Sequence, residues 1–181
     1  MAHLAVNIVV IQDGKILLTK RDDFETWILP GGGVEEGESL AQAGIRETKE
    51  ETGLDVELTR LVGVYSRLGS WSPGYIVLFA AKRVGGAIQR QEGETIAVEW
   101  FAFDKITAPL ALGHRRRIKD AIEGVSRALV LQEFKLPSLP KPLTGNERID
   151  RFQKSGLSRQ GLYLQMIEGA ELREIIEVVN V

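Results

Sequence analysis

The segment from Pro30 to Gly53, PGGGVEEGESLAQAGIRETKEETG, constrains the fold of this chain more than any other part of the sequence. Ser39, followed three residues later by Gln42, forms a capping box, which predicts that a helix begins there. Gly53 stands where a residue in the left-handed conformation would end that helix. The sequence therefore predicts a helix over residues 39–52 that follows closely on a run of three glycines.

Two sides of the predicted helix differ in character. A moderately apolar stripe, which we expect to face a sheet, recurs at spacings of four, three and four: Ala41, Ile45, Thr48 and Thr52. Glu47, Glu50 and Glu51 fall on a different side, and their i, i+3, i+4 spacing gathers three carboxylates within one turn. Mg²⁺ prefers oxygen ligands and often binds carboxylates together with substrate phosphates. The cluster is a candidate metal site, although a solvated acidic face is the commoner role of such a group.

The three glycines do not belong to either of the common phosphate-binding loops. A P-loop ends in Gly-Lys-Ser/Thr, whereas here the glycines lead to Val34, Glu35 and Glu36. A G-x-G-x-x-G motif that starts at Gly31 would need glycine where Glu36 stands. The glycines must therefore serve another purpose.

The patterns on either side of this segment predict a mixed α/β sheet flanked by helices over residues 1–125. An Asp-Gly turn between LAVNIVVI and KILLTKR predicts a hairpin, and a short strand precedes the glycines. Further strands are predicted at about residues 55–68, 75–83 and 95–103. A second helix is predicted over residues 113–124, with its basic side expected to be a solvated surface.

Residues 126–181 are interpreted as a C-terminal extension, because the composition changes after Gly124. LQEFKLPSLPKPLTG predicts an extended connector, and residues 146–181 are predicted to be mostly helical, with ELREIIEVV as the clearest amphipathic helix. We expect the extension to cover the substrate cleft, to form a homodimer interface or to cover a sheet edge; a stability or oligomer role is favoured. Four of its cations could approach phosphates if it folds over the site: Arg148, Arg151, Lys154 and Arg159.

Charge and composition argue against several classes of protein. The formal net charge of −2 provides no basic field for nucleic acid or an anionic membrane. The absence of cysteine excludes disulfides and thiolate metal sites, and it suits a reducing compartment. LAVNIVVI is too short to span a membrane. We therefore expect a cytoplasmic protein with no signal peptide, no membrane association and no specific DNA binding.

From Gly32 to Leu54 the sequence resembles the Nudix box, G-x5-E-x7-R-E-U-x-E-E-x-G-U, where U is a bulky aliphatic residue. The residues in register are Gly32, Glu38, Arg46, Glu47, Glu50, Glu51, Gly53 and Leu54. Thr48 departs from the pattern, which concerns the packing of the helix and leaves the ligand set intact. The resemblance to MutT-like Nudix hydrolases covers about residues 4–124 and leaves the tail outside it.

This resemblance implies a Nudix fold, an α/β/α sandwich around a mixed sheet, and a hydrolase acting on a nucleotide-type small molecule. Such enzymes cleave a nucleoside diphosphate linked to another moiety, generally with Mg²⁺ or Mn²⁺. The cation ligands that it implies by position are Glu47, Glu50 and Glu51. Among the residues of the box, it assigns the catalytic roles to Glu47, Arg46 and Glu50.

The other residues of the box would support this chemistry. The resemblance places Glu38 in the outer shell of the site, and Arg46 would orient a glutamate through a charge-assisted hydrogen bond. Gly32 and Gly33 would let the backbone approach the metal and the phosphates closely. The general base would be Glu47 or a carboxylate from a loop outside the box.

Two further segments carry candidate functional residues. In RQEGETIAVEW the loop carboxylates are Glu92 and Glu94, and Glu94 is also a candidate metal ligand. YSRLGSWSPGY is a candidate specificity loop whose residues could stack on a base or clamp a phosphate: Tyr65, Arg67, Trp71 and Tyr75. Of these we select Arg67 and Tyr75 as substrate contacts.

The alternative to an enzyme is a non-catalytic Nudix-fold module that senses a ligand. Such modules often lose glutamates of the box, whereas this chain keeps Glu47, Glu50 and Glu51. A Nudix-fold isomerase is a weaker alternative because the box is intact.

Overall fold

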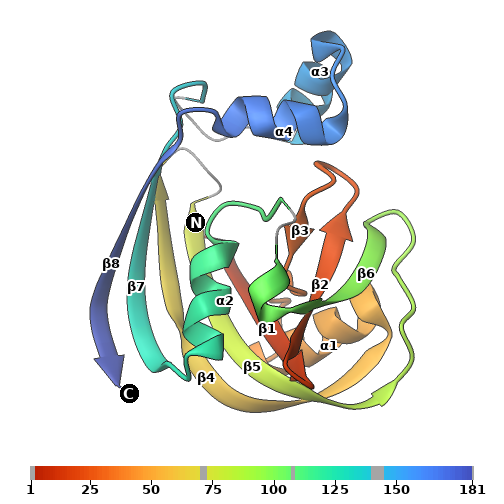
Figure 1. Cartoon of the computed structure of the whole chain (residues 1–181), viewed down its shortest axis with the longest axis vertical. Helices are drawn as coiled ribbons and strands as arrows, with labels where there is room; N and C mark the ends of the chain where they lie inside the picture. Colours follow the sequence, from red (N-terminus) through yellow and green to blue (C-terminus); the bar gives the residue numbers. More distant parts are fainter. Residues whose placement is uncertain (1–2, 70–72, 107–108, 140–144, 181) are drawn as a thin grey trace.

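The computed structural model describes residues 3–69, 73–106, 109–139 and 145–180. The strands are β1 (His3–Gln12), β2 (Lys15–Arg21), β3 (Trp27–Ile28), β4 (Leu54–Gly69), β5 (Gly74–Gly86), β6 (Thr95–Ala102), β7 (Ser126–Lys135) and β8 (Glu171–Asn180). They form an eight-stranded sheet of order β3-β2-β1-β5-β4-β7-β8, with β6 paired to β2 (Figure 1). The β1–β5 and β4–β7 pairs are parallel, while β1–β2 and β4–β5 are antiparallel, so the predicted mixed sheet is confirmed.

The first hairpin forms where the Asp-Gly turn predicts it. Asp13 and Gly14 have φ values of 50° and 70°, and positive φ at both central residues matches the right-handed twist of the flanking strands. Residues along β1 alternate between two cores: Val9 packs in the cluster that contains Ile118, whereas Val6 packs with Ala43. Because Ile118 and Ala43 belong to different helices, β1 is covered on both faces.

Helix α1 (Leu40–Thr52) has the predicted ends but turns a different side to the sheet. Ser39 and Gln42 form the capping box, and Gly53 ends the helix with φ 74°. The predicted stripe is wrong at its N-terminal half, because Ile45 is 42% exposed. The buried residues are Ala43, Gly44, Thr48, Glu51 and Thr52. Small side chains decide the contact, since a Cβ on Gly44 would lie 2.5 Å from Cδ1 of Ile8 in β1.

Helix α2 (His114–Ile122) covers the other face, where Ile118 and Ala121 join the largest core cluster. The basic side of this helix was predicted to be a solvated surface, but part of it is buried. Arg117 is 1% exposed, and His114 and Asp120 are also buried. The helix therefore brings a cation into the interior, next to the site described below.

The C-terminal extension joins the sheet instead of forming only a connector and helices. Strand β7 pairs in parallel with β4 across the predicted boundary at residue 125, and β8 pairs with β7. Helices α3 (Gly145–Ser155) and α4 (Arg159–Ile167) agree with the predicted helical tail, but the helix predicted for ELREIIEVV is wrong. Its β-branched residues suit a pleated strand, and β7 offers the edge it needs.

Helix α4 lies across the end of the sheet near β2 and β3 (Figure 1). Its Leu162, Tyr163 and Met166 form a core cluster with Phe24, which precedes β3, and Phe134 of β7. Residues 126–181 therefore share both a sheet and a hydrophobic core with residues 1–125. None of the described helices is long and apolar enough to cross a membrane.

Candidate active site

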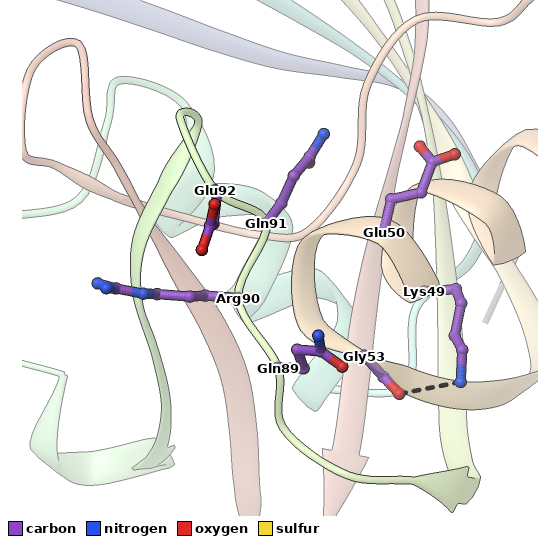
Figure 2. A pocket seen from close by; sticks show the side chains of 7 residues that line it. All are labelled: Lys49, Glu50, Gly53, Gln89, Arg90, Gln91 and Glu92. Carbon is purple, nitrogen blue, oxygen red and sulfur yellow. Dashed lines mark hydrogen bonds between the residues drawn. The ribbon is translucent and has the colours of Figure 1, made fainter.

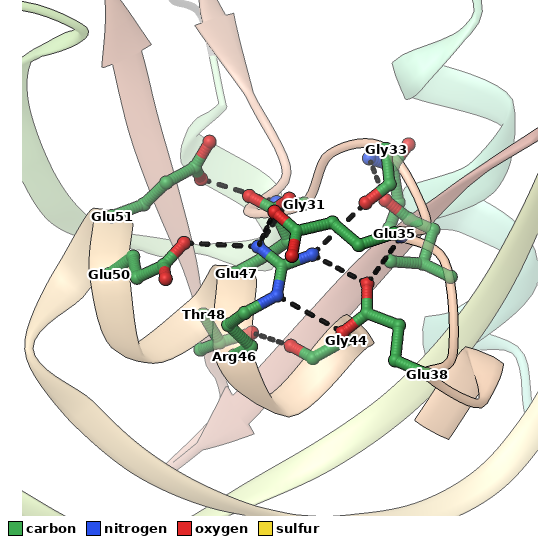
Figure 3. Close-up of polar contacts among 12 residues, drawn as sticks. Gly31, Gly33, Glu35, Glu38, Gly44, Arg46, Glu47, Thr48, Glu50 and Glu51 are labelled. Carbon is green, nitrogen blue, oxygen red and sulfur yellow. Dashed lines mark hydrogen bonds and ion pairs between the residues drawn. The ribbon is translucent and has the colours of Figure 1, made fainter. Parts of the chain in front are cut away.

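Arg46 is the centre of a network of carboxylates on α1 and the loop before it (Figure 3). Its Nη2 and Nε donate to Glu38 at 2.7 and 3.1 Å. Its Nη1 donates to Glu47 at 2.9 Å and to Glu50 at 3.1 Å. These bonds lower the pKa of Glu38 and raise the pKa of Arg46, in each case chiefly through the Glu38–Arg46 hydrogen bond. Arg46 thus fixes the side chains of three glutamates of the box.

Glu51 lies on the inner side of α1 and is 8% exposed. Its Oε2 accepts from the backbone N–H of Gly31 at 3.2 Å and from the hydroxyl of Thr19 at 3.4 Å. Burial raises the pKa of Glu51 to about 8, and Glu47 and Glu94 add to the rise as neighbouring negative charges. A buried carboxyl held against the glycine segment is suited to receive a positive charge.

Glu47, Glu51 and Glu94 line one pocket of about 440 Å³, together with the segment Gly31–Gly33. Burial raises the pKa of Glu47 even though Arg46 opposes the rise, and Glu50 and Glu94 raise it further. The structure therefore brings the loop carboxylate Glu94 close to two carboxylates of the box.

The glycine segment runs beside β1 and leaves room for Glu47. The backbone carbonyl of Gly32 accepts from Val6 N–H at 2.9 Å. A Cβ on Gly32 would lie 2.4 Å from Oε1 of Glu47, so a larger residue there would displace this carboxylate. The carbonyl of Gly33 accepts from Nη2 of Arg46 at 3.1 Å. At Gly32 the absence of a side chain thus serves a contact within the protein itself.

Glu50 and Glu92 border a different hollow, of about 580 Å³, between α1 and the loop after β5 (Figure 2). Lys49, Gly53 and the loop from Gln89 form the rest of its lining, and Lys49 Nζ donates to the carbonyl of Gly53. Of the two loop carboxylates, Glu94 therefore shares a pocket with Glu47 and Glu51, whereas Glu92 lines a hollow with Glu50.

The donor set of the Glu47–Glu51–Glu94 pocket fits a divalent cation. All three side chains offer oxygen, which Mg²⁺ and Mn²⁺ prefer. Burial, and after it the negative charges nearby, raise the pKa of Glu47 and of Glu51, and a bound cation would oppose both effects. Within the described residues, no three acidic or histidine side chains already converge as a cage for a metal ion. The carboxylates are instead held by Arg46, Thr19 and the Gly31 backbone.

A further pocket, of about 350 Å³, adjoins the pocket of Glu47, Glu51 and Glu94 and is called the second pocket below. The two pockets share Arg21, Asp23 and the Gly31–Gly33 segment. Of the predicted substrate contacts, Arg67 lines the second pocket. Tyr75 is 45% exposed and pairs with Ser66, so it points to the opposite face from Arg67. Trp71 lies outside the described residues.

Tyr65, a candidate of the specificity loop, and Trp27 both pack in the core. Tyr65 is buried and donates to Asp120 at 2.7 Å. Trp27 is buried against Phe101.

The sequence analysis missed several residues that line the second pocket: Asn7, Phe24, His114, Arg117 and Tyr163. His114 lines this pocket from the first position of α2, and its Nδ1 accepts from Leu29 N–H at 3.1 Å. Arg117 could have been noticed from its i, i+3 spacing to His114 on an amphipathic helix. Tyr163 gave no local signal, because only the packing of α4 brings it to the pocket.

One of the four cations of the extension reaches the edge of the site. Arg159 donates to the carboxylate and the carbonyl of Asp22, and Asp22 N–H donates to the carbonyl of Glu94 at 2.9 Å. Lys154 instead pairs with Asp150, and Arg151 lines a separate hollow. The side chain of Arg148 is not described.

We expect buried His114 to make stability depend on pH. Burial, reinforced by Arg117, Arg67 and Arg21, holds its pKa well below 6.5. The unfolded chain then binds the extra proton first, so stability is full above about pH 6.5 and falls as the pH drops below it. His114→Asn keeps an acceptor for Leu29 N–H but cannot titrate. Urea unfolding is measured from pH 7.5 to 5. Below pH 6, the free energy of unfolding of the parent should fall by up to about 1.4 kcal/mol per pH unit more than that of the variant. If the two plots of unfolding free energy against pH are parallel, His114 is not the group responsible.

Comparison with known proteins adds a family match to this geometry. The model of the NUDIX domain family matches residues 1–121. A MutT-like protein of Streptomyces ambofaciens is 35% identical over 117 residues, which cover 65% of this chain and 74% of the relative. An ADP-ribose pyrophosphatase of Methanocaldococcus jannaschii is 37% identical over 122 residues, covering 65% and 71%. The crystal structure of an ADP-ribose pyrophosphatase from Streptococcus suis superposes with a TM-score of 0.62 at 30% identity, over 68% of this chain and 92% of that one.

Proposed function

This chain belongs to the NUDIX domain family, whose hydrolases cleave phosphoanhydride bonds, and from that premise we propose that it is a divalent-metal-dependent pyrophosphohydrolase of nucleotide derivatives. The observation that carries the proposal is the pocket lined by Glu47, Glu51 and Glu94 next to the glycine segment. This pocket adjoins a second, partly apolar one of suitable size for the rest of a nucleotide. The relative named as an ADP-ribose pyrophosphatase supports a substrate of this class.

Glu47 and Glu51 would hold Mg²⁺ or Mn²⁺, with Glu50 at the edge of the site. When bound, the cation neutralises phosphate oxygens and lowers the pKa of a water molecule. Arg46 keeps Glu47 and Glu50 in place through the hydrogen bonds described above, and Glu38 in turn orients Arg46 at 2.7 Å. This arrangement fixes the carboxylates before the substrate arrives, which lowers the cost of ordering them.

Glu94 is our candidate for the general base. It is exposed on a loop, lies in the pocket of Glu47 and Glu51, and is tethered through its backbone to Asp22. Glu47 is less suited to that role because Arg46 already donates to its Oε1. A carboxylate on an exposed loop can accept the proton of an attacking water and release it to solvent.

A panel of substrates tests the proposal. The protein is incubated with Mg²⁺ and nucleoside triphosphates, sugar nucleotides, ADP-ribose, dinucleoside polyphosphates or capped RNA, and the products are separated by ion-exchange chromatography. We expect cleavage of a diphosphate linkage in at least one class, and complete loss of turnover when EDTA removes the cation. An absence of turnover across the panel would contradict the proposal and favour a ligand-binding module.

A further inference from the structure

Helix α4 lies outside the residues that the family model matches, yet it is packed against the rest of the chain. Its Leu162, Tyr163 and Met166 are buried in a shared apolar cluster. The Tyr163 hydroxyl accepts from the Leu112 N–H at 2.9 Å. Arg159 is the first residue of this helix, so its side chain extends from an element whose position is fixed.

The Arg159 guanidinium holds both the backbone and the side chain of Asp22. Its Nη1 donates to the Asp22 carbonyl at 2.9 Å and also to the Asp22 carboxylate. The guanidinium lies 5.8 Å from the centroid of the Phe152 ring in α3, which further limits its position. Asp22 follows β2 and lines the pocket proposed above for the cation. Arg159 thus connects the C-terminal extension to the lining of that pocket.

Asp22 in turn holds the loop that carries Glu94. The Asp22 N–H donates to the Glu94 carbonyl at 2.9 Å. Strands β2 and β6 pair in one register up to Lys20, and the register shifts before the last pair, Arg21 with Thr95. A bulge of this kind interrupts the ladder and re-aims the side chains beside it. The hydrogen bond between Asp22 and Glu94 therefore lies beyond the regular ladder, where the direction of Glu94 is set.

The ion pair of Arg159 and Asp22 contributes little to the stability of the fold. The two side chains are 38% and 40% exposed, and solvent screens a pair at that exposure. Helix α4 stays attached through its buried apolar residues in any case. The main effect of the pair is therefore on where Asp22 and its partner Glu94 lie.

We propose that Arg159 is a positioning residue for the hydrolysis: acting through Asp22, it holds Glu94 where that carboxylate can accept the proton of the attacking water. The inference rests on the proposed function, in which Glu94 is the general base, and extends it to a residue of the C-terminal extension. A base acts within hydrogen-bond reach of the proton that it removes, and a displacement of about 1 Å can lower the rate by about 10²-fold. Loss of Arg159 should therefore lower kcat and leave KM unchanged.

Arg159→Met tests this role, because methionine keeps an unbranched apolar side chain beside Phe152 but donates no hydrogen bond. With the compound that the parent hydrolyses fastest, we expect kcat to fall about 10- to 100-fold and KM to stay within about twofold. Lys154→Met is the control, since Lys154 pairs with Asp150 inside the extension at 2.7 Å, and it should keep the parent's kcat. A parental kcat in Arg159→Met, or an equal fall in Lys154→Met, overturns the inference.

A double-mutant cycle separates positioning of Glu94 from a general structural role of Arg159. Glu94→Gln alone should lower kcat by about 10²-fold or more, because it removes the base. If Arg159 acts through Glu94, Arg159→Met should change kcat by less than about threefold once glutamine stands at position 94. An equal fall in kcat in both backgrounds would show that Arg159 acts elsewhere, which contradicts the proposal.

Hydrogen exchange followed by NMR reports the tether without any substrate. In Arg159→Met the Asp22 amide, which bonds to the Glu94 carbonyl, should exchange about tenfold faster or more than in the parent. The Ile8 amide, which bonds to the Pro30 carbonyl at 2.9 Å, should exchange at the parent's rate. Unchanged exchange at Asp22, or equal acceleration at both amides, counts against a tether held by Arg159.

The kinetic results distinguish failure of this inference from failure of the proposed function. A parental kcat in Arg159→Met beside a slow Glu94→Gln overturns the inference alone. A parental kcat in Glu94→Gln contradicts the assignment of Glu94 as the base, and the inference falls with it. An absence of turnover by the parent enzyme with every compound of the panel overturns the proposed function itself.

Discussion

Glu51→Gln is expected to lower kcat/KM for the hydrolysed substrate by roughly 10³-fold while leaving the fold intact. Glu51 is the most buried of the carboxylates in the cation pocket, so its charge is the one that solvent can least replace. Glutamine has the same shape but cannot supply a negative charge to Mg²⁺. The loss of rate should therefore come with loss of the thermal stabilisation that Mg²⁺ gives to the parent protein.

The metal-free variant should be at least as stable as the parent. The amide oxygen of glutamine can still accept from Gly31 N–H and the Thr19 hydroxyl, the two partners of Glu51. Because the pKa of Glu51 is about 8, the parent carboxyl is already largely protonated at pH 7 without metal. Thermal unfolding with EDTA checks this expectation, and a large fall in Tm would show that Glu51 has a structural role instead.

Glu36→Gln is the matched control for this experiment. Glu36 is exposed in the loop of the same box and lines neither the cation pocket nor its neighbour. Glu36→Gln replaces a glutamate by glutamine, as Glu51→Gln does, but away from both pockets. This variant should therefore keep the parent's rate and its thermal stabilisation by Mg²⁺. Equal loss of rate in both variants would attribute the effect to net charge and exclude a specific role for Glu51.

The sequence predicted the first half of the fold well because its signals are local. An Asp-Gly turn needs positive φ at two adjacent residues, and the capping box needs only Ser39 and Gln42. The stripe on α1 was wrong for a tertiary reason. Periodicity favoured Ile45, but the sheet leaves room for the side of the helix that carries Gly44. Local patterns cannot report how closely two elements approach.

The C-terminal extension was predicted less well because its structure depends on partners far away in the sequence. Strand β8 contains a run of glutamates and aliphatic residues whose spacing also suits a helix, and pairing with β7 decides between the two. The helices were predicted, but their contact with Phe24 was not. The contribution of Tyr163 to the pocket could not be inferred from any neighbouring residue.

In the candidate site too, residues with a local sequence pattern were predicted, and residues placed by distant contacts were missed. The spacing of Glu47 and Glu51 indicated a shared site, and the structure places both in one pocket with Glu94. Arg117 was missed because a basic helix usually has a solvated charged face. Its burial depends on bonds to Asn7 and to the carbonyl of Gly113, which only the packed structure brings together.

Gly31→Ala is expected to destabilise the protein by about 3 kcal/mol or more, the largest effect on stability that we predict for a single methyl group. Gly31 has φ 143°, and an added Cβ would lie 2.1 Å from the carbonyl oxygen of Val6. On either side of it, Pro30 and Gly32 accept from the backbone of β1 at 2.9 Å. The clash therefore has to separate two hydrogen-bonded backbones, and no rotamer change can relieve it. Urea unfolding of the metal-free protein measures the loss.

Gly37→Ala separates the clash from the cost of the backbone conformation. Gly37 lies in the same loop with φ 85°, but no atom lies within 4 Å of the position that its Cβ would occupy. Alanine there should cost about 1 kcal/mol, the price of a left-handed residue alone. If Gly31→Ala costs no more than Gly37→Ala, the glycine segment can move away from β1. The close approach to β1 would then not explain the glycine at position 31. The remaining explanation would be that the backbone there must come close to a phosphate. In that case Gly31→Ala should lower kcat/KM with little change in the free energy of unfolding.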